Sequence, residues 1–305
     1  MMAPREVLER YPGIQSGCRW HPLTNSGGFS GAILWRGELD GVPIFALKRY
    51  PAEVTNERVQ QIHDWQKLTA ALPFVPRLIA ATNRETRIEH GGFLWELSSW
   101  MPGVAHFHRE PCEAKLRSAC EAIFQLHDVW KILQTPPQPI PAIQRRIDLL
   151  TGWKPTSECG IRAEADAVVR RLRPAILDEL QSWQTRRFPL RPCLADVHRE
   201  HVLFTGTHVT GIIDYGAMKL DHVAVDAARF LGDACAEDLS MYRLGCELFV
   251  HRYGNDHCPV ELMELLDRSG NLGAIAFWLN RNDPSPKAQA RLARLLGSAL
   301  RATSN

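Results

Sequence analysis

The chain has 305 residues, enough for two domains or lobes, and its 45% hydrophobic and 23% charged residues are ordinary for a globular protein. Its 36 basic and 34 acidic side chains leave a formal net charge of +2, so neither a nucleic-acid partner nor an acidic partner is predicted. No apolar run approaches the ~20 residues that span a membrane, and the start of the chain lacks the apolar core of a signal peptide. The eight cysteines form no Cys-x-x-Cys pair, which indicates reduced thiols and a cytoplasmic protein.

The first chemical signal is a glycine-dense turn over residues 25–31. At its centre stand Gly27, Gly28, Phe29 and Ser30. Strands are expected at 32–36 and 42–50, with the hairpin signal Asp40-Gly41 between them. Glycines let backbone N–H groups approach phosphate oxygens, and Lys48 on the return strand can reach the same phosphates. The alternative is a plain hairpin with an exposed lysine, which the apolar neighbours of Lys48 disfavour.

A helix is expected after Pro51, with Thr55 or Asn56 as its N-cap. Its core face follows from apolar residues at helical spacing, namely Val59, Ile62, Trp65, Leu68 and Leu72. Further strands are expected at 76–81 and 92–97, and the Pro102-Gly103 pair then ends regular structure. The predicted organisation is therefore an N-terminal lobe at 1–98, a hinge at 99–103 and a C-terminal lobe at 104–305.

The C-terminal lobe is predicted to be mostly helical around one hairpin. Helices are expected at 112–133, 143–150, 163–183, 223–231, 239–253, 259–266 and 286–301, with a proline-rich linker at 136–141. Asp196 stands before the hairpin and Asp214 directly after it. Two acids brought together in this way suit phosphoryl transfer, since one can accept the proton of a substrate hydroxyl while the other holds the magnesium that bridges the phosphates. The alternative is a hairpin flanked by two surface acids.

In this order, the glycine turn, strand lysine, lobe exit and spaced acids resemble the aminoglycoside phosphotransferase and choline kinase-like family. The resemblance covers about residues 20–235 in element order. Its specific points are Gly27-Gly28-Phe29-Ser30, Leu47-Lys48, Trp100-Met101-Pro102-Gly103, Asp196 with Val202-Leu203-Phe204, Ile213-Asp214-Tyr215-Gly216 and Asp226-Ala227-Ala228. It implies an α+β, protein-kinase-like fold of two lobes, with a small antiparallel sheet in the N-lobe and a mainly helical C-lobe.

The resemblance also implies an ATP-dependent enzyme that phosphorylates a hydroxyl of a small molecule. The residues from Gly27 to Ser30 would cover the ATP phosphates and Lys48 would contact the α- and β-phosphates. Backbone groups near Ser99, Trp100 and Met101 would hold the adenine. Asp196 would be the catalytic base, Asp214 a Mg²⁺ ligand, and Asp226 a brace for the catalytic loop.

The chain departs from the family pattern at two places. Leu194-Ala195 stands where the family carries His-Gly, and His201 stands where it carries a metal-binding Asn. Mg²⁺ prefers oxygen ligands, whereas imidazole suits zinc, manganese or iron. His201 is therefore expected to bind a metal such as Mn²⁺, to hydrogen-bond Asp196, or to mark a site with one metal only.

Four further points stay open in the sequence. The helix acid expected to pair with Lys48 is either Glu57 or Asp64. A nucleotide-binding, pseudokinase-like protein with little or no transfer activity is the second hypothesis, because of His201. A metal-dependent enzyme of another class, with His198, His201 and Asp214 as ligands, is the third. The acceptor is not predicted, because the candidate lining residues are more often a solvated helix face; they are Glu261, Glu264, Asp267, Trp278 and Asp283.

Overall fold

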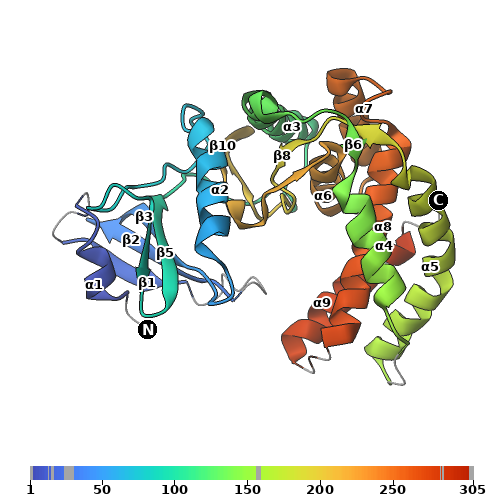
Figure 1. The fold of residues 1–305 in the computed structure, drawn as a ribbon, viewed down its shortest axis with the longest axis horizontal. Coiled ribbons are helices and arrows are strands. Elements are labelled where there is room, and N and C mark those ends of the chain that lie inside the picture. The colour runs from blue at the N-terminus through green and yellow to red at the C-terminus, as the bar shows by residue number, and fades with distance from the viewer. Residues whose placement is uncertain are drawn as a thin grey trace. The chain divides into compact units, whose positions relative to one another are not determined.

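The computed structural model describes residues 3–12, 14, 17–23, 31–155, 159–281, 283 and 285–301. The chain forms two compact units, each drawn in Figure 1. Unit 1 comprises Met1–Glu110 and Glu200–Ala217, and unit 2 comprises Pro111–Arg199 and Met218–Asn305. The division into 1–98, 99–103 and 104–305 remains a prediction.

Unit 1 contains the antiparallel sheet that the sequence predicts. In the described residues it has five strands in the order β1-β2-β3-β5-β4. Their bounds are β1 Arg19–Pro22, β2 Ile33–Leu39, β3 Val42–Arg49, β4 Arg87–His90 and β5 Phe93–Ser99. The hairpin signal is confirmed, because Asp40 and Gly41 turn between β2 and β3 with φ of 50° and 80°.

One strand prediction in this unit is wrong. Residues 76–81 form no strand, and within this segment only Leu78 makes an isolated bridge, to Ser98. On the side away from β3, β5 pairs instead with β4, which carries the polar residues Arg87, Glu89 and His90. Because β4 is short and has one buried residue, Ile88, it lacks the apolar alternation that identifies a strand in a sequence.

Helices α1 (Arg5–Leu8) and α2 (Asn56–Leu68) lie beside the sheet in unit 1 (Figure 1). Thr55 caps α2 as predicted, since its hydroxyl oxygen accepts a hydrogen bond of 3.3 Å from the Arg58 N–H. Val59 and Ile62 are buried as expected. The helix ends at Leu68, which is 40% exposed, and so does not extend to Leu72.

The sheet places different chemistry on its two faces, because side chains alternate along a strand. One face carries Trp35, Leu47, Trp95 and Leu97, which form a buried cluster with Val7 and Tyr11. The other face packs Tyr50 and Leu94 against Val59 of α2. By the same alternation, Lys48 and Glu96 belong to the face that meets α2.

A second hairpin belongs to unit 1 and packs on the segment that follows β5. It consists of β9 (Val202–Thr205) and β10 (His208–Ile212), as predicted. Val104 and Phe204 exchange two backbone hydrogen bonds of 3.0 Å. A Cβ on Gly211 would lie 2.8 Å from the Cβ of Met101, so only glycine allows this close approach. The hairpin that bears Asp214 is thus held directly against the predicted hinge.

Unit 2 is mainly helical, as predicted. Its helices are α3 Glu113–Trp130, α4 Pro141–Gly152, α5 Ile161–Gln184, α6 Ala224–Ala234, α7 Leu239–Tyr253, α8 Val260–Arg281 and α9 Pro286–Arg301. Short strands are β6 Gln138–Pro139, β7 Arg187–Phe188, β8 Arg191–Cys193 and β11 Lys219–Asp221. Helices α4, α5, α8 and α9 lie side by side (Figure 1).

Two boundaries in unit 2 differ from the prediction. Helix α8 continues to Arg281 instead of ending near 266, because Leu272, Ile275 and Leu279 continue its buried face. The segment at 136–141 contains β6, and α4 begins at its last proline, Pro141, where a missing N–H costs no helical hydrogen bond.

Two general expectations can be compared with the described residues. All eight cysteines lie among them and none forms a disulfide. Within the same residues, no helix combines the length and apolar composition that crossing a bilayer requires.

Candidate active site

Unit 1 brings together two residues that the sequence singled out, Lys48 and Asp214. Lys48 Nζ lies 3.0 Å from Asp214 Oδ1, and their side chains are 13% and 46% exposed. The ammonium group also lies 4.9 Å from the centre of the Tyr50 ring. This ion pair joins β3 to the second residue after β10, and the two residues are 166 positions apart in the chain.

The electrostatics of the pair are mutual. Burial lowers the pKa of Lys48, but the carboxylates of Asp214 and Glu96 more than offset it, so the pKa is raised overall. The charge of Lys48 in turn holds the pKa of Asp214 far below its usual value, and His201 acts in the same direction. Both groups of the pair are therefore ionised around neutral pH.

The backbone around Asp214 is specialised. Asp214 has φ of 62°, a left-handed conformation that Asp tolerates better than most residues. The Gly216 N–H donates a hydrogen bond of 3.3 Å to Asp214 Oδ1. A Cβ on Gly216 would lie 3.2 Å from both Asp214 Oδ1 and Lys48 Nζ, a tight contact that glycine avoids.

His201 also lies beside Asp214. Its Nε2 is 3.8 Å from Asp214 Oδ2, and the Ile213 N–H donates to the His201 carbonyl at 2.9 Å. The ion pair with Lys48 falls on Oδ1, so Oδ2 is the oxygen nearest the imidazole. One carboxylate oxygen and one imidazole nitrogen suit a divalent ion such as Mn²⁺ better than Mg²⁺.

The predicted adenine-binding segment has a selective hydrogen-bond pattern. The Ser99 N–H donates to the Arg77 carbonyl and the Trp100 N–H to the Ile44 carbonyl, both at 2.9 Å. The Met101 N–H has no backbone acceptor in the part of the chain that the structure describes. It is therefore the one of these three amide groups that can donate to a ligand. The predicted phosphate-covering residues Gly27, Gly28, Phe29 and Ser30 lie outside the described residues.

Asp196 lies in unit 2, on the loop that follows β8. The Arg229 guanidinium on α6 donates from Nε to Asp196 Oδ1 at 2.7 Å. Asp196 is 46% exposed, so its carboxylate reaches solvent while Arg229 holds it. The loop is also fixed further on, where the Arg199 N–H donates to Asp233 at 3.1 Å.

Asp226 holds the backbone just before Asp196. Its fully buried carboxylate accepts hydrogen bonds from the N–H groups of Leu194 (2.9 Å) and Ala195 (2.7 Å) and contacts Nε2 of His127 at 2.9 Å. Ala195 has φ of 63°, a conformation in which glycine is easiest. The Leu194-Ala195 departure is therefore accommodated, because the hydrogen bonds to Asp226 fix the turn.

The two helix acids offered as partners of Lys48 do not pair with it. Asp64 is bonded to Gln60 at 2.5 Å and lies 3.6 Å from Lys67 on the outside of α2. Glu57 stands exposed in the first turn, where the backbone and Thr55 lower its pKa. Besides Asp214, the acid that acts electrostatically on Lys48 is Glu96 of β5, its cross-strand partner. Sequence reasoning missed it, although an acid within the apolar run 93–97 was a visible signal.

The candidate acceptor residues divide between surface and interior. Glu261 and Glu264 are exposed, which agrees with a solvated helix face, and Trp278 is buried. Asp267 is partly buried, and burial raises its pKa to about 7, although Arg229 and Arg146 oppose the shift. Exposure alone therefore gives no reason to assign the two acids to a binding site.

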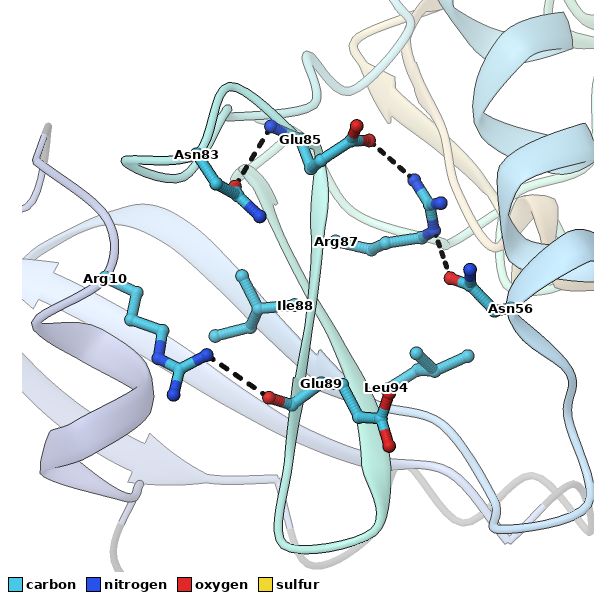
Figure 2. A pocket seen from close by; sticks show the side chains of 8 residues that line it. All are labelled: Arg10, Asn56, Asn83, Glu85, Arg87, Ile88, Glu89 and Leu94. Carbon is cyan, nitrogen blue, oxygen red and sulfur yellow. Dashed lines mark hydrogen bonds and ion pairs between the residues drawn. The ribbon is translucent and has the colours of Figure 1, made fainter.

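One hollow of unit 1 lies apart from these residues. Figure 2 shows its lining, in which the polar side chains are mostly bonded to one another. Arg87 bonds Asn56 at 2.5 Å and Glu85 at 2.8 Å, and Arg10 donates to the Glu89 carbonyl at 3.3 Å. Part of the polar lining is therefore already engaged by hydrogen bonds within the hollow itself.

Three comparisons place the chain among known proteins. No curated protein matches it. Among solved structures it is similar to an aminoglycoside phosphotransferase from Alicyclobacillus acidocaldarius subsp. acidocaldarius DSM 446, with 14% identity and a TM-score of 0.64 over 100% of this chain and 94% of that one. It is also similar to amicoumacin kinase hAmiN in complex with AMP-PNP, Ca²⁺ and Ami, with 13% identity and a TM-score of 0.66 over 98% and 92% of the chains.

A third solved structure, a spectinomycin phosphotransferase in complex with ADP and spectinomycin, has 13% identity and a TM-score of 0.64 over 98% of this chain and 97% of that one. These similarities confirm the predicted α+β, protein-kinase-like fold. The model of the phosphotransferase enzyme family matches residues 23–264, which is most of the chain. The protein therefore belongs to the phosphotransferase enzyme family.

Proposed function

We propose that this protein is an ATP-dependent kinase that phosphorylates a hydroxyl group of a small molecule in the cytoplasm. The observation that carries the proposal is the ion pair of Lys48 with Asp214, 3.0 Å long, at the positions that the family resemblance assigns to phosphate and metal binding. The family match and the kinases among the similar structures support the reaction class.

In the proposed reaction, the acceptor hydroxyl oxygen forms a bond to the γ-phosphorus of ATP while the bond from that phosphorus to the leaving ADP oxygen breaks. Asp196 orients the hydroxyl and accepts its proton. Its half-exposed carboxylate, oriented by Arg229 and in contact with solvent, suits this role. Lys48 neutralises charge on the α- and β-phosphates, with the ammonium already oriented by ionised partners.

For the nucleotide, the Met101 N–H is the proposed donor to the adenine, since the neighbouring amide groups of Ser99 and Trp100 are already bonded. Asp214 and His201 are the proposed metal ligands. A divalent ion bound there would neutralise charge on the β- and γ-phosphates. The mixed oxygen and nitrogen donors lead us to expect activity with Mn²⁺ at least equal to that with Mg²⁺.

The test is ATP turnover by the purified protein with Mg²⁺ and then Mn²⁺, against pooled small hydroxyl compounds. Acceptor-dependent ADP release should fall by about 10²- to 10⁴-fold in Asp196→Asn. Asp238→Asn is a matched control, because Asp238 is an exposed N-cap of α7 and Asn caps equally well. Turnover that is independent of Asp196 would refute the assigned base.

A second candidate function is nucleotide binding with little or no transfer, and His201 favours it. An imidazole 3.8 Å from Asp214 stands where the family carries an amide oxygen for the metal. This candidate predicts that nucleotide binds while no ADP forms with either metal, and that His201→Asn restores turnover with Mg²⁺.

A further inference from the structure

We propose that Glu96 of β5 serves as the structural acid for Lys48 and that His63 of α2 locks Glu96 in place, so that both are positioning residues for the phosphate-binding lysine. The resemblance led us to expect this acid on α2, at Glu57 or Asp64. In the structure, α2 supplies an imidazole and the sheet supplies the carboxylate. The inference deepens the proposed function and rests on it, because it assigns Lys48 to the phosphates.

The sheet register brings the two charges together. Lys48 of β3 and Glu96 of β5 are directly opposed residues of an antiparallel pair. Side chains opposed in this way share one face, with Cβ atoms about 4.5–5.5 Å apart. Glu96 raises the pKa of Lys48. Burial raises the pKa of Glu96, but the hydrogen bond from His63 and the charge of Lys48 lower it, and the net effect is a lowered pKa.

Glu96 is itself held by two groups. Its Oε2 lies 2.8 Å from Nε2 of His63 and accepts a hydrogen bond from the Tyr50 hydroxyl. Both contacts fall on Oε2, so they fix the carboxylate without occupying Oε1. The His63 ring is fully buried, and its other nitrogen, Nδ1, lies 2.8 Å from Thr86 Oγ1. A ring bonded at both nitrogens is held in one orientation, so it ties α2 to Glu96 on β5.

A second acid is needed because Asp214 has another proposed task. In the structure, Asp214 Oδ1 is paired with Lys48. If Asp214 held a metal ion and Lys48 a phosphate, the partly buried ammonium would lose that partner. Glu96 then remains as the carboxylate opposite Lys48 on the sheet, since it is anchored independently of Asp214.

The kinetic test compares Glu96→Gln with Glu96→Asp. Gln removes the charge, so kcat/KM for ATP should fall by about 10- to 100-fold, mainly through the KM for ATP. Asp keeps the charge on a shorter stem and should recover part of the loss. His63→Leu removes the donor to Glu96 and should reproduce the defect, and adding it to Glu96→Gln should cost little more, because the two act as one unit.

Glu89→Gln is the matched control, since Glu89 is an exposed acid on the adjacent strand β4 and should leave the kinetic constants unchanged. A purely structural role for Glu96 would lower the melting temperature of Glu96→Gln while the folded variant kept wild-type kinetic constants. That result would overturn the inference.

A crystal structure of Glu96→Gln separates the two proposals. A displaced Lys48 in this variant would support the positioning role, whether or not the wild-type protein transfers phosphate. An inactive wild-type protein would refute only the proposed function. If the wild-type protein is an active kinase and Lys48 stays in place with unchanged kinetics in Glu96→Gln, the positioning role is refuted and the kinase assignment stands.

Discussion

Replacing Asp226 by Asn tests how the loop before Asp196 is fixed. In the protein, Asp226 Oδ2 lies 2.9 Å from both the Leu194 N–H nitrogen and His127 Nε2, and Oδ1 accepts from the Ala195 N–H at 2.7 Å. Asn has one acceptor oxygen, so at least one buried donor would face the NH₂ group. A lost hydrogen bond to a charged group costs about 1.5–3 kcal/mol, and the remaining ones become weaker neutral bonds.

The sum is about 3–5 kcal/mol, the range observed when one partner of a buried ionic group is removed. With a urea m-value of about 1–3 kcal/mol/M, the unfolding midpoint should fall by at least ~1 M. The assay is urea unfolding followed by circular dichroism, with the exposed Asp238→Asn as control. A change below about 0.5 kcal/mol, the scatter of ordinary surface substitutions, would refute the bracing role of Asp226.

Three further predictions concern stability. Ala195→Gly should change the free energy of unfolding by less than about 1 kcal/mol, whereas Ala195→Val should lower it by at least ~1 kcal/mol, because a φ of 63° suits glycine and disfavours a β-branched residue. Equal melting curves for the two variants would contradict this. Gly245→Ala should destabilise by about 1–2 kcal/mol in urea despite better helix propensity, because the new Cβ would lie 2.3 Å from Cδ2 of the fully buried Leu231; a more stable variant would show that α7 can shift. Burial lowers the pKa of His222 to about 3. Between about pH 6.5 and 3, the unfolded chain therefore binds a proton at His222 that the folded protein does not bind. The free energy of unfolding should accordingly fall on acidification by up to about 1.4 kcal/mol per pH unit. His222→Asn, which keeps an acceptor for the Ala224 N–H, should flatten the curve of unfolding free energy against pH, and an unchanged slope would contradict the assignment.

The sequence predicted the parts of the site that local patterns define. Lys48 follows from its place on the return strand of a hairpin, and Asp214 from an acid between an apolar strand and a glycine. Local patterns also narrowed the N-cap of α2 to Thr55 or Asn56, of which Thr55 is the cap, and predicted most helices of unit 2. These features depend on residues a few positions apart, so their signal survives in a single sequence.

The sequence could not supply features that depend on register and long-range packing. Glu96 lies opposite Lys48 only because β3 and β5 pair with this register, although β4 lies between these two strands in the sequence. His63 of α2 contacts Glu96 although the two residues are 33 positions apart. The sequence pointed instead to the acids of the same helix, Glu57 and Asp64. Likewise β4 was missed because the pairing with β5, and not its own composition, makes it a strand.

The most direct test of the central claim is transfer of the γ-phosphoryl group from labelled ATP to a hydroxyl compound, with the product identified by mass spectrometry. We predict a phosphorylated acceptor with the wild-type protein and at least a ~100-fold lower yield with Asp196→Asn, while the nucleotide affinity of that variant stays unchanged. An equal yield of phosphorylated acceptor from Asp196→Asn, or tight nucleotide binding with no transfer to any acceptor under Mg²⁺ or Mn²⁺, would contradict the account.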